Sequence, residues 1–379
     1  MRLLIHDLKA DEYKRIESEY RNDCVVSDQG TIRPCIGCFG CWKKDPGRCV
    51  VKDGYENMGQ LIHEADEVVV ISRYSYGGFS SFIKNVFDRC LGYVLPHFEL
   101  VNGESHHMKR YDEDKPFTFI FYGHDLKEED KEKAERYVRA VCTNIRGSVK
   151  EIIFEEKEER ERRLCEGFDP EGRAVLLNVS MRTQGNSARL AEKLKGKLKR
   201  KTEVLSLAKY LNDMSSLLKE LSDASVIIFS LPLYVDGLPS QMIRLLERFE
   251  EEYHGLSKKI YVLANMGLYE SGQLVNLFDA VKTWCGKMGF DYCGGIGVSA
   301  GELIGVLMQH LPFRGWPMNR ISKGMDALAQ AIDGAEKIGD IYSGPVLFPR
   351  SLYIAIANRG WAKGARENGL DPKELFRRL

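Results

Sequence analysis

The segment RAVLLNVSMRTQGNS (residues 173–187) joins an apolar run to a polar loop and the start of a helix. Its first seven residues lack strict alternation of apolar and polar side chains, which is typical of a parallel strand buried on both faces. The amphipathic pattern that follows over residues 187–199 predicts a helix. A strand, a polar loop and a helix in this order predict the first unit of a doubly wound α/β domain.

Similar apolar runs recur along the whole chain, separated by amphipathic patterns such as that of residues 240–253. In the second half they cover residues 173–179, 202–207, 224–231, 258–265 and 294–299. In the first half they cover residues 2–7, 23–27, 67–72, 117–123 and 149–156. We therefore predict two doubly wound domains in tandem, each with a five-stranded parallel sheet.

Two long segments, residues 63–89 and residues 221–249, resemble each other. Each reads as a helix end, an apolar strand, a turn with Tyr and Gly, and a helix that closes on an acid followed by Arg. Tyr76 aligns with Tyr234, and Arg89 aligns with Arg248 after a one-residue slip. We interpret this similarity as a tandem duplication, although any strand–helix unit shares part of the pattern.

The domain boundary is visible in composition. Residues 155–163 (EEKEERERR) are charged almost without interruption, and a stretch with two glycines and a proline follows. We interpret them as a solvated helix end and a linker, so that the first domain covers residues 1–165 and the second residues 172–379. From about residue 316 the pattern predicts a C-terminal helical extension, which we expect to pack on the second domain or on a partner subunit.

Charge and hydropathy exclude several classes of partner. The 379 residues include 55 lysines and arginines and 55 aspartates and glutamates, so no overall field attracts nucleic acid or an anionic membrane. The N-terminus lacks the pattern of a signal peptide, and no apolar run approaches the about 20 residues of a membrane span. We expect a cytoplasmic protein whose ten cysteines are thiols or metal ligands.

The polar loop after residue 179 has the composition of a phosphate site. Backbone N–H groups at a helix start, hydroxyl groups and an arginine together supply the donors that a phosphate requires. The residues that we expect to bind the phosphate are Ser180, Arg182, Gln184, Gly185, Asn186 and Ser187. The alternative is that Asn186 or Ser187 serves only as a helix N-cap.

Two further loops follow the third and fourth strands of the second half. The carboxyl ends of parallel strands meet at one crevice in a doubly wound sheet, and Tyr234 offers a flat surface to an aromatic ring. The residues that we expect to border such a ring are Pro232, Leu233, Tyr234, Val235, Asn265, Met266, Gly267 and Tyr269. A single anion site beside ring-sized walls predicts a mononucleotide, and the glycine-rich dinucleotide fingerprint is absent from the sequence.

The three loops together resemble those of a known family. The patterns Ser180-x-Arg182-x-x-Gly185-Asn186-Ser187, Pro232-x-Tyr234 and Asn265-x-Gly267 are similar to the FMN loops of flavodoxin-like NAD(P)H-dependent FMN reductases over residues 172–300. The resemblance implies that the first loop binds the FMN phosphate and that the other two border the isoalloxazine ring. Val179 and Met181 stand where the family usually has Gly and Pro, which affects loop stiffness more than binding chemistry.

The corresponding turn of the first half has a different composition. Residues 7–12 (DLKADE) contain three acids and one lysine, and three carboxylates would repel a phosphate. We therefore predict a degenerate phosphate loop and no flavin in the first domain. The turn Tyr76-Gly77-Gly78 could still accept an aromatic ring.

The first half also contains a compact run of cysteines. Cys35, Cys38, Cys41 and Cys49 follow the spacing C-x2-C-x2-C-x7-C, with glycines between them that allow backbone N–H groups to approach sulfur. Structural zinc sites usually divide their ligands into two separated pairs, which this run does not do. The run resembles the cysteine motif of iron–sulfur flavoproteins, which implies a [4Fe–4S] cluster. The alternative is a cluster-free loop whose Phe39 and Trp42 pack over a flavin or an interface.

These resemblances imply an FMN-dependent oxidoreductase that passes electrons from NAD(P)H or a reduced protein to an acceptor. The flavin would carry the chemistry, so we expect no side chain to act as a general acid or base. The alternative is a non-catalytic electron carrier or redox-sensing flavoprotein. A homodimer would allow a cluster to relay electrons between subunits.

Overall fold

The computed structural model describes residues 1–124, 126–157, 164–344 and 348–379. The chain forms two compact units, of which the first comprises Met1–Arg160 with Ile354–Leu379 and the second comprises Glu161–Tyr353. Residues 158–163 of the predicted helix end lie outside the described residues. Residues 155–157 continue the last strand of the first sheet, because each pairs with a residue of the neighbouring strand. This agrees with the strand predicted over residues 149–156 and contradicts the helix end predicted to begin at residue 155.

The first unit contains a five-stranded parallel sheet, as predicted, with the strand order β2-β1-β3-β6-β7. Counted along the chain within this sheet, the order is 2-1-3-4-5, which is the flavodoxin-like order. The strands are β1 (Arg2–His6), β2 (Cys24–Ser27), β3 (Glu67–Arg73), β6 (Lys115–His124) and β7 (Gly147–Lys157).

The second unit contains a six-stranded parallel sheet in the order β13-β12-β11-β10-β8-β9. Its first five strands repeat the flavodoxin-like order, and the sixth is an addition that we did not predict. A three-residue strand after a helix carries too little periodicity to be recognised. The strands are β8 (Arg173–Asn178), β9 (Thr202–Ser206), β10 (Ala224–Pro232), β11 (Lys259–Asn265), β12 (Asp291–Val298) and β13 (Ile341–Ser343).

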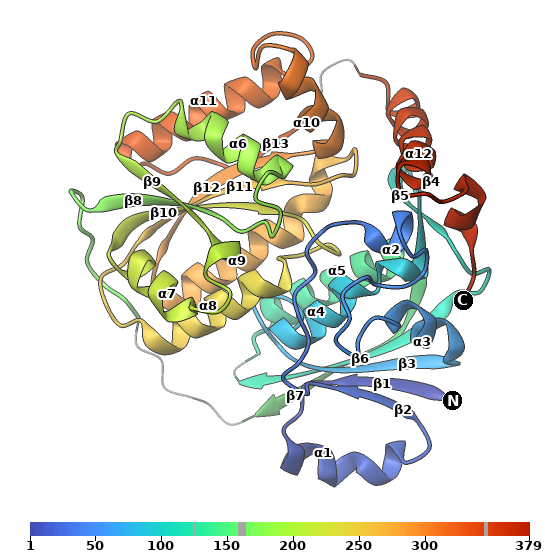
Figure 1. Cartoon of the computed structure of the whole chain (residues 1–379). Coiled ribbons are helices and arrows are strands. Elements are labelled where there is room, and N and C mark those ends of the chain that lie inside the picture. Colours follow the sequence, from blue (N-terminus) through green and yellow to red (C-terminus); the bar gives the residue numbers. More distant parts are fainter. Residues whose placement is uncertain (125, 158–163, 345–347) are drawn as a thin grey trace. The chain divides into compact units, whose positions relative to one another are not determined.

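Helices cover both faces of each sheet (Figure 1). In the first unit α3, α4 and α5 lie on one face and α1 on the other, and in the second unit α6 and α11 lie opposite α7, α8 and α9. The helices of the first unit are α1 (Ala10–Ile16), α2 (Gly40–Lys43), α3 (Met58–Glu64), α4 (Ser81–Arg89) and α5 (Glu128–Ile145). Those of the second are α6 (Asn186–Lys195), α7 (Met214–Ser222), α8 (Ser240–Glu252), α9 (Val275–Met288), α10 (Gly301–His310) and α11 (Asn319–Gly334). The chain ends with α12 (Arg350–Glu367) and the 3-10 turn η5 (Pro372–Phe376).

The apolar runs form strands because two layers of helices bury them. Every residue of β10 before Pro232 is buried, and so is every residue of β11 after Lys259. The edge strand β2 is partly exposed. Among the described residues no helix is both long and apolar enough to cross a membrane.

A β-hairpin in the first unit was not predicted. Strands β4 (Val94–Val101) and β5 (Glu104–Lys109) are antiparallel and are joined by Asn102 and Gly103. Both linking residues have positive φ angles, of 51° and 86°, as the tight turns of two-residue hairpins require. The Asn-Gly pair is the signal that could have revealed this hairpin.

The two similar segments form the same strand–turn–helix arrangement in both units. Ser75 and Gly78 form an isolated antiparallel bridge in the first unit, as Tyr234 and Gly237 do in the second. Tyr234 therefore corresponds to Ser75 rather than to Tyr76, and Arg248 corresponds to Arg89 without the slip that we expected. The shared geometry agrees with a duplication, which stays a prediction because any right-handed strand–helix unit can adopt it.

The end of the chain packs differently from what we expected. Residues 354–379 belong to the first unit, whereas we assigned the whole extension to the second domain. Asn358 accepts a hydrogen bond from the backbone N–H of Phe98 at 2.8 Å, and the buried Arg110 donates to the carbonyl oxygens of Leu375 and Arg377. The donors of a buried guanidinium need acceptors, and the C-terminal tail supplies two carbonyl oxygens to Arg110.

We predict that Leu375→Ala destabilises the first unit by about 2–5 kcal/mol, because the side chain of Leu375 is fully buried. Calorimetric unfolding should show a lower transition temperature for this unit. Leu100→Ala is the matched control, since Leu100 is 52% exposed in the same unit. Equal shifts in the two variants would show that the tail contributes no packing energy.

Candidate functional site

The predicted phosphate loop lies at the carboxyl end of β8, where seven residues separate Asn178 from Asn186. Ser180 and Ser187 are buried in this loop. The amide oxygen of Asn178 accepts a hydrogen bond from the Ser180 N–H at 3.1 Å, and the Ser180 hydroxyl accepts one from the Arg182 N–H at 3.2 Å. Asn178 holds the loop and was missed by sequence reasoning, although a polar residue at the end of an apolar strand is a usable signal.

Hydrogen bonds join the three predicted loops of the second unit. The Ser187 hydroxyl donates to Oδ1 of Asn265 at 2.6 Å, and the Asn265 carbonyl accepts from the Leu233 N–H at 2.8 Å. The buried Ser230 hydroxyl donates to the Ser187 carbonyl at 2.9 Å. The loops after β8, β10 and β11 therefore meet at one edge of the sheet, as the strand order requires.

Helix α6 begins at this edge with unsatisfied backbone donors. Its N-cap residue, Gly185, has no side chain with which to cap the helix. Within the described part of the chain, five backbone N–H groups here have no protein acceptor, namely those of Thr183, Gln184, Asn186, Ser187 and Ala188. These donors and the positive end of the helix dipole fit an anion, and a phosphate in particular.

The half-exposed Arg182 adds positive charge to the loop. Its guanidinium lies 3.8 Å from the carboxylate of Glu302, at the start of α10. Helix α10 also packs on α6, where Arg189 donates to the carbonyl oxygen of Gly305 at 3.1 Å. A Cβ atom at Gly305 would lie 2.0 Å from Oδ1 of Asn186, so this glycine permits the close approach. Helix α10 was absent from the sequence-based prediction.

The second loop contains two residues in an unfavourable backbone conformation. Val235 and Asp236 have φ angles of 37° and 57° in the turn between Tyr234 and Gly237. Positive φ is an outlier for a β-branched residue such as valine. Such conformations are maintained where the surroundings impose them and occur frequently at ligand-binding sites.

The third loop differs in part from the expectation. Met266 is buried, and its carbonyl accepts a hydrogen bond from the Gly301 N–H at 2.7 Å. Tyr269 donates its hydroxyl proton to the carbonyl oxygen of Phe348 at 2.5 Å. The buried Tyr353, which sequence reasoning missed, donates to the carbonyl oxygen of Gly267. The backbone of this loop is therefore held by residues from the end of the second unit.

The first unit has a shorter turn at the corresponding position, between β1 and α1. Only three residues separate His6 from Ala10, where the second unit has seven. The Asp7 carboxylate accepts hydrogen bonds from the Arg73 N–H and the Tyr122 hydroxyl, each at 3.1 Å, and burial raises its pKa. This short turn is lined by acids and lacks the length of the loop before α6, which supports the prediction of a degenerate site.

The turn at Tyr76 does not present an open aromatic surface. Tyr76 is buried, and a Cβ atom at Gly78 would lie 2.8 Å from the ring of Tyr137 in α5. The expectation that this turn could accept a ring is therefore wrong, because α5 already covers it.

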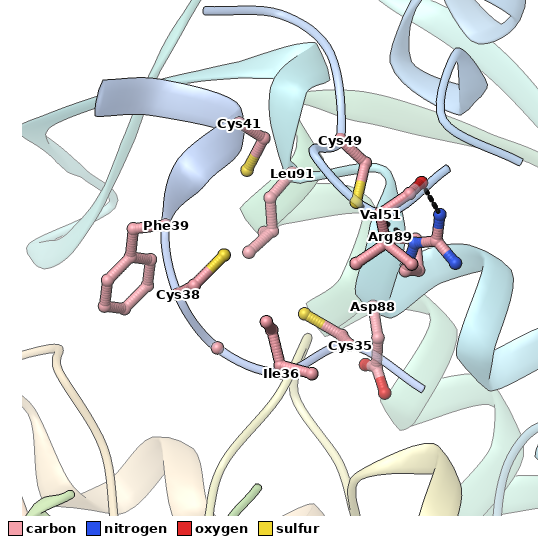
Figure 2. Close-up of a pocket in the computed structure, with 11 residues that line it drawn as sticks. Cys35, Ile36, Cys38, Phe39, Cys41, Cys49, Val51, Asp88, Arg89 and Leu91 are labelled. Atoms are coloured by element: carbon pink, nitrogen blue, oxygen red, sulfur yellow. Dashed lines mark hydrogen bonds between the residues drawn. The ribbon is translucent and has the colours of Figure 1, made fainter. Parts of the chain in front are cut away.

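The four cysteines of the first unit line one cavity (Figure 2). Figure 2 shows their sulfur atoms directed toward a shared space between the loop of residues 35–41 and the end of α4. Two backbone features allow the loop to curve in this way, since Gly37 and Phe39 have φ angles of 63° and 56°. A Cβ atom at Gly40 would lie 2.7 Å from the side chain of Val50, so the loop packs closely there.

Hydrogen-bond donors face sulfur atoms that line this cavity. The Gly40 N–H donates to Cys38 Sγ at 3.3 Å, and Nε of the buried Arg89 donates to Cys49 Sγ at 3.2 Å. Burial, the nearby Asp88 carboxylate and the other thiols together raise the pKa of Cys35 to about 12. Burial and the neighbouring thiols also raise the pKa of Cys41 well above its ordinary value. Without a metal, these two thiols remain protonated at neutral pH.

The arrangement of the four cysteines can be compared with the geometry of a single-ion site. Zinc binds each sulfur at about 2.3 Å, so a zinc site needs four sulfur atoms within about 4 Å of one another. Within the residues that the structure describes, no group of three or more His, Cys, Asp or Glu side chains is arranged to hold one metal ion.

The aromatic residues of the cysteine loop pack inside the first unit. Trp42 is buried, and its Nε1–H lies 2.9 Å from the carbonyl oxygens of both Leu91 and Val94. Phe39 stacks on Trp42 at 5.4 Å, and Trp361 of α12 meets both rings edge-on. These contacts account for Phe39 and Trp42 without a flavin above them.

Comparisons with known proteins agree with part of this description. No family model matches the chain. It is 32% identical over 88 residues to an iron–sulfur flavoprotein of Methanocaldococcus jannaschii, a match that covers 23% of this chain and 42% of that protein. The chain thus spans less than half the length of this curated relative.

Solved structures align more weakly. An azoreductase from Bacillus anthracis str. Sterne is 13% identical with a TM-score of 0.32, over 43% of this chain and 99% of that one. A flavone reductase is 16% identical with a TM-score of 0.33, over 44% and 66% of the two chains. The Trp repressor binding protein of Bacillus subtilis is 20% identical with a TM-score of 0.30, over 34% and 84%. The strand order of both sheets and the sequence match together support the resemblance of this chain to flavodoxin-like FMN reductases and iron–sulfur flavoproteins.

Proposed function

We propose that the protein is an FMN-dependent oxidoreductase that binds one FMN per chain, in its second unit. The observation that carries this proposal is the loop before α6, whose free backbone N–H groups and helix N-terminus fit a phosphate monoester. The sequence similarity to a protein named as an iron–sulfur flavoprotein also supports this proposal.

When bound, FMN would supply the redox chemistry by accepting electrons from NAD(P)H or a reduced protein and passing them to an acceptor. The residues of this chain would bind and orient it. The loop of residues 180–187 would hold the phosphate, the loop of residues 232–235 would border the ring, and Asn265 would link the first loop to the third. This role requires no side chain to act as a general acid or base.

We further propose that Cys35, Cys38, Cys41 and Cys49 bind a [4Fe–4S] cluster. Four soft ligands line one cavity, and hydrogen-bond donors face sulfur atoms that line it, as is common around iron–sulfur clusters. A packing role for the cysteines is the competing interpretation.

The proposed function predicts one equivalent of FMN per chain and rapid oxidation of NADH or NADPH with an artificial acceptor. The measurement is flavin quantitation of the purified protein followed by a steady-state assay with each nucleotide. Slow reduction by both nucleotides, with fast electron exchange to a reduced protein partner, would favour an electron carrier instead. Absence of bound flavin after reconstitution with FMN would contradict the proposal as a whole.

A further inference from the structure

Arg89, the last residue of α4, has an unusual environment beside the cysteine cavity. Its side chain is 0% exposed, and each of its five N–H groups has an acceptor in the segment of residues 33–53. Nε donates to Cys49 Sγ, while Nη1 and Nη2 bind the Asp53 carboxylate at 2.7 and 2.8 Å. The remaining two bonds reach the carbonyl oxygens of Arg33 and Val51. One side chain therefore connects both ends of the cysteine loop.

The corresponding position of the second unit shows that the helix itself does not require this arrangement. Arg248 occupies the same place in the repeated strand–turn–helix segment, but its side chain is 32% exposed. It binds Glu252 of its own helix and the hydroxyl of Ser215, and it has no cysteine loop to hold. The burial of Arg89 is thus specific to the unit that contains the four thiols.

Arg89 lies among charged groups and donates one of its hydrogen bonds to sulfur. Asp53 binds the guanidinium with both carboxylate oxygens, so the buried positive charge of Arg89 is compensated. The carboxylate of Asp88 also lines the cavity, and it forms a buried ion pair with Lys84. The bond from Nε is nevertheless directed at sulfur, and a charge-assisted hydrogen bond to sulfur becomes stronger as the sulfur becomes more negative.

We propose that Arg89 is a positioning residue of the cysteine site, which holds Cys49 Sγ toward the cavity and stabilises negative charge on that sulfur. The consequence for reduction potential rests on the proposed [4Fe–4S] cluster. Hydrogen bonds to ligand sulfur are among the factors that set cluster potentials, and they favour the reduced form, which carries more negative charge. The consequence for thiol position does not depend on a cluster.

The test compares Arg89→Gln and Arg89→Lys with the wild type, using Arg248→Gln as the matched control. After anaerobic purification we would measure iron release to a chelator and the reduction potential. In Arg89→Gln we expect iron to leave about 10- to 100-fold faster, as for other residues that orient metal ligands, and the potential to become more negative. Arg89→Lys, which retains the charge but lacks the guanidinium fork, should lie between. Arg248→Gln should match the wild type.

The outcomes separate this inference from the cluster proposal. Equal release rates and potentials in wild type and both Arg89 variants would overturn the positioning role. If Arg89→Gln fails to fold, as judged by the unfolding transition of the first unit, the iron release rate and the reduction potential of Arg89→Lys are compared with those of the wild type instead. Equal values would again overturn the positioning role. A wild type without iron would overturn the cluster, and a thiol-specific alkylating reagent would then be applied to the metal-free chain. Loss of the guanidinium also lowers the thiolate fraction, so labelling is compared at a pH at which Cys49 is ionised in both proteins. Faster labelling of Cys49 in Arg89→Gln under these conditions would support the inference, and equal labelling would refute it.

Discussion

Asn186→Asp is expected to weaken FMN binding by about 100-fold or more, because it places a carboxylate at the first residue of α6, beside the proposed phosphate. The substitution preserves the size and shape of the side chain. Two like charges about 5 Å apart repel by several kcal/mol at the effective dielectric constant of a partly buried site, and the phosphate carries up to two charges. The helix itself should become more stable, since an acid in the first turn favours the dipole by about 0.3–1 kcal/mol.

This opposite effect on stability and affinity separates the two roles considered for Asn186. If the residue only starts a helix, Asp should serve equally well and FMN binding should not change. If its surroundings bind phosphate, affinity should fall while the second unit unfolds at the same or a higher temperature. Titration of the flavin-free protein with FMN, followed by flavin fluorescence, gives the affinity.

Ala10→Asp provides a matched control for this experiment. It introduces the same charge at the first residue of α1, the corresponding helix of the first unit. Because that unit has a three-residue turn in place of the loop, FMN content should be unchanged. Loss of flavin in Ala10→Asp would mean that the first unit also takes part in binding, which would contradict our assignment of one site per chain.

The strands and the polar loop between β8 and α6 could be predicted from sequence because both depend on local pattern. A parallel strand buried on both faces, such as β10 or β11, is an apolar run whatever surrounds it. Residues 180–187 combine hydroxyl groups, an amide, a glycine and an arginine directly before a helix, which is a local pattern too. The same reasoning recognised the acidic turn of the first unit, although it overlooked that this turn is four residues shorter.

Elements that depend on distant contacts could not be predicted in this way. Strand β13 has three residues and exists because β12 offers it an edge. Residues 354–379 belong to the first unit because the buried Arg110 and the aromatic pair Phe39 and Trp42 receive them there. No local pattern in the tail indicates which partner it will contact.

The cysteine site shows the same division between local and distant information. The spacing of the four cysteines predicted candidate ligands that lie around one cavity. Arg89 lies 40 residues after Cys49, and in sequence it is only the arginine that closes a repeated helix. Sequence alone could not reveal the hydrogen bond from Arg89 to sulfur, because the equivalent Arg248 has the same sequence context but a different environment in the structure.

Cys38→Ser is expected to remove nearly all iron and acid-labile sulfide from anaerobically purified protein, while FMN content stays near one per chain. A hydroxyl is a poor ligand for iron compared with a thiolate, and Cys38 Sγ already accepts the Gly40 N–H that should support a bound cluster. FMN should remain because its proposed loops belong to the second compact unit.

The control for Cys38→Ser is Cys142→Ser. Cys142 is a buried cysteine of α5 in the same unit, and it does not line the cysteine cavity. Its replacement should leave iron content unchanged, so a general loss of stability in the first unit could not imitate the effect. Air can oxidise exposed thiols and strip a cluster, which makes anaerobic handling part of the measurement. Near-zero iron in the wild type under these conditions would assign the four cysteines a packing role and leave the protein as an FMN reductase without a cluster.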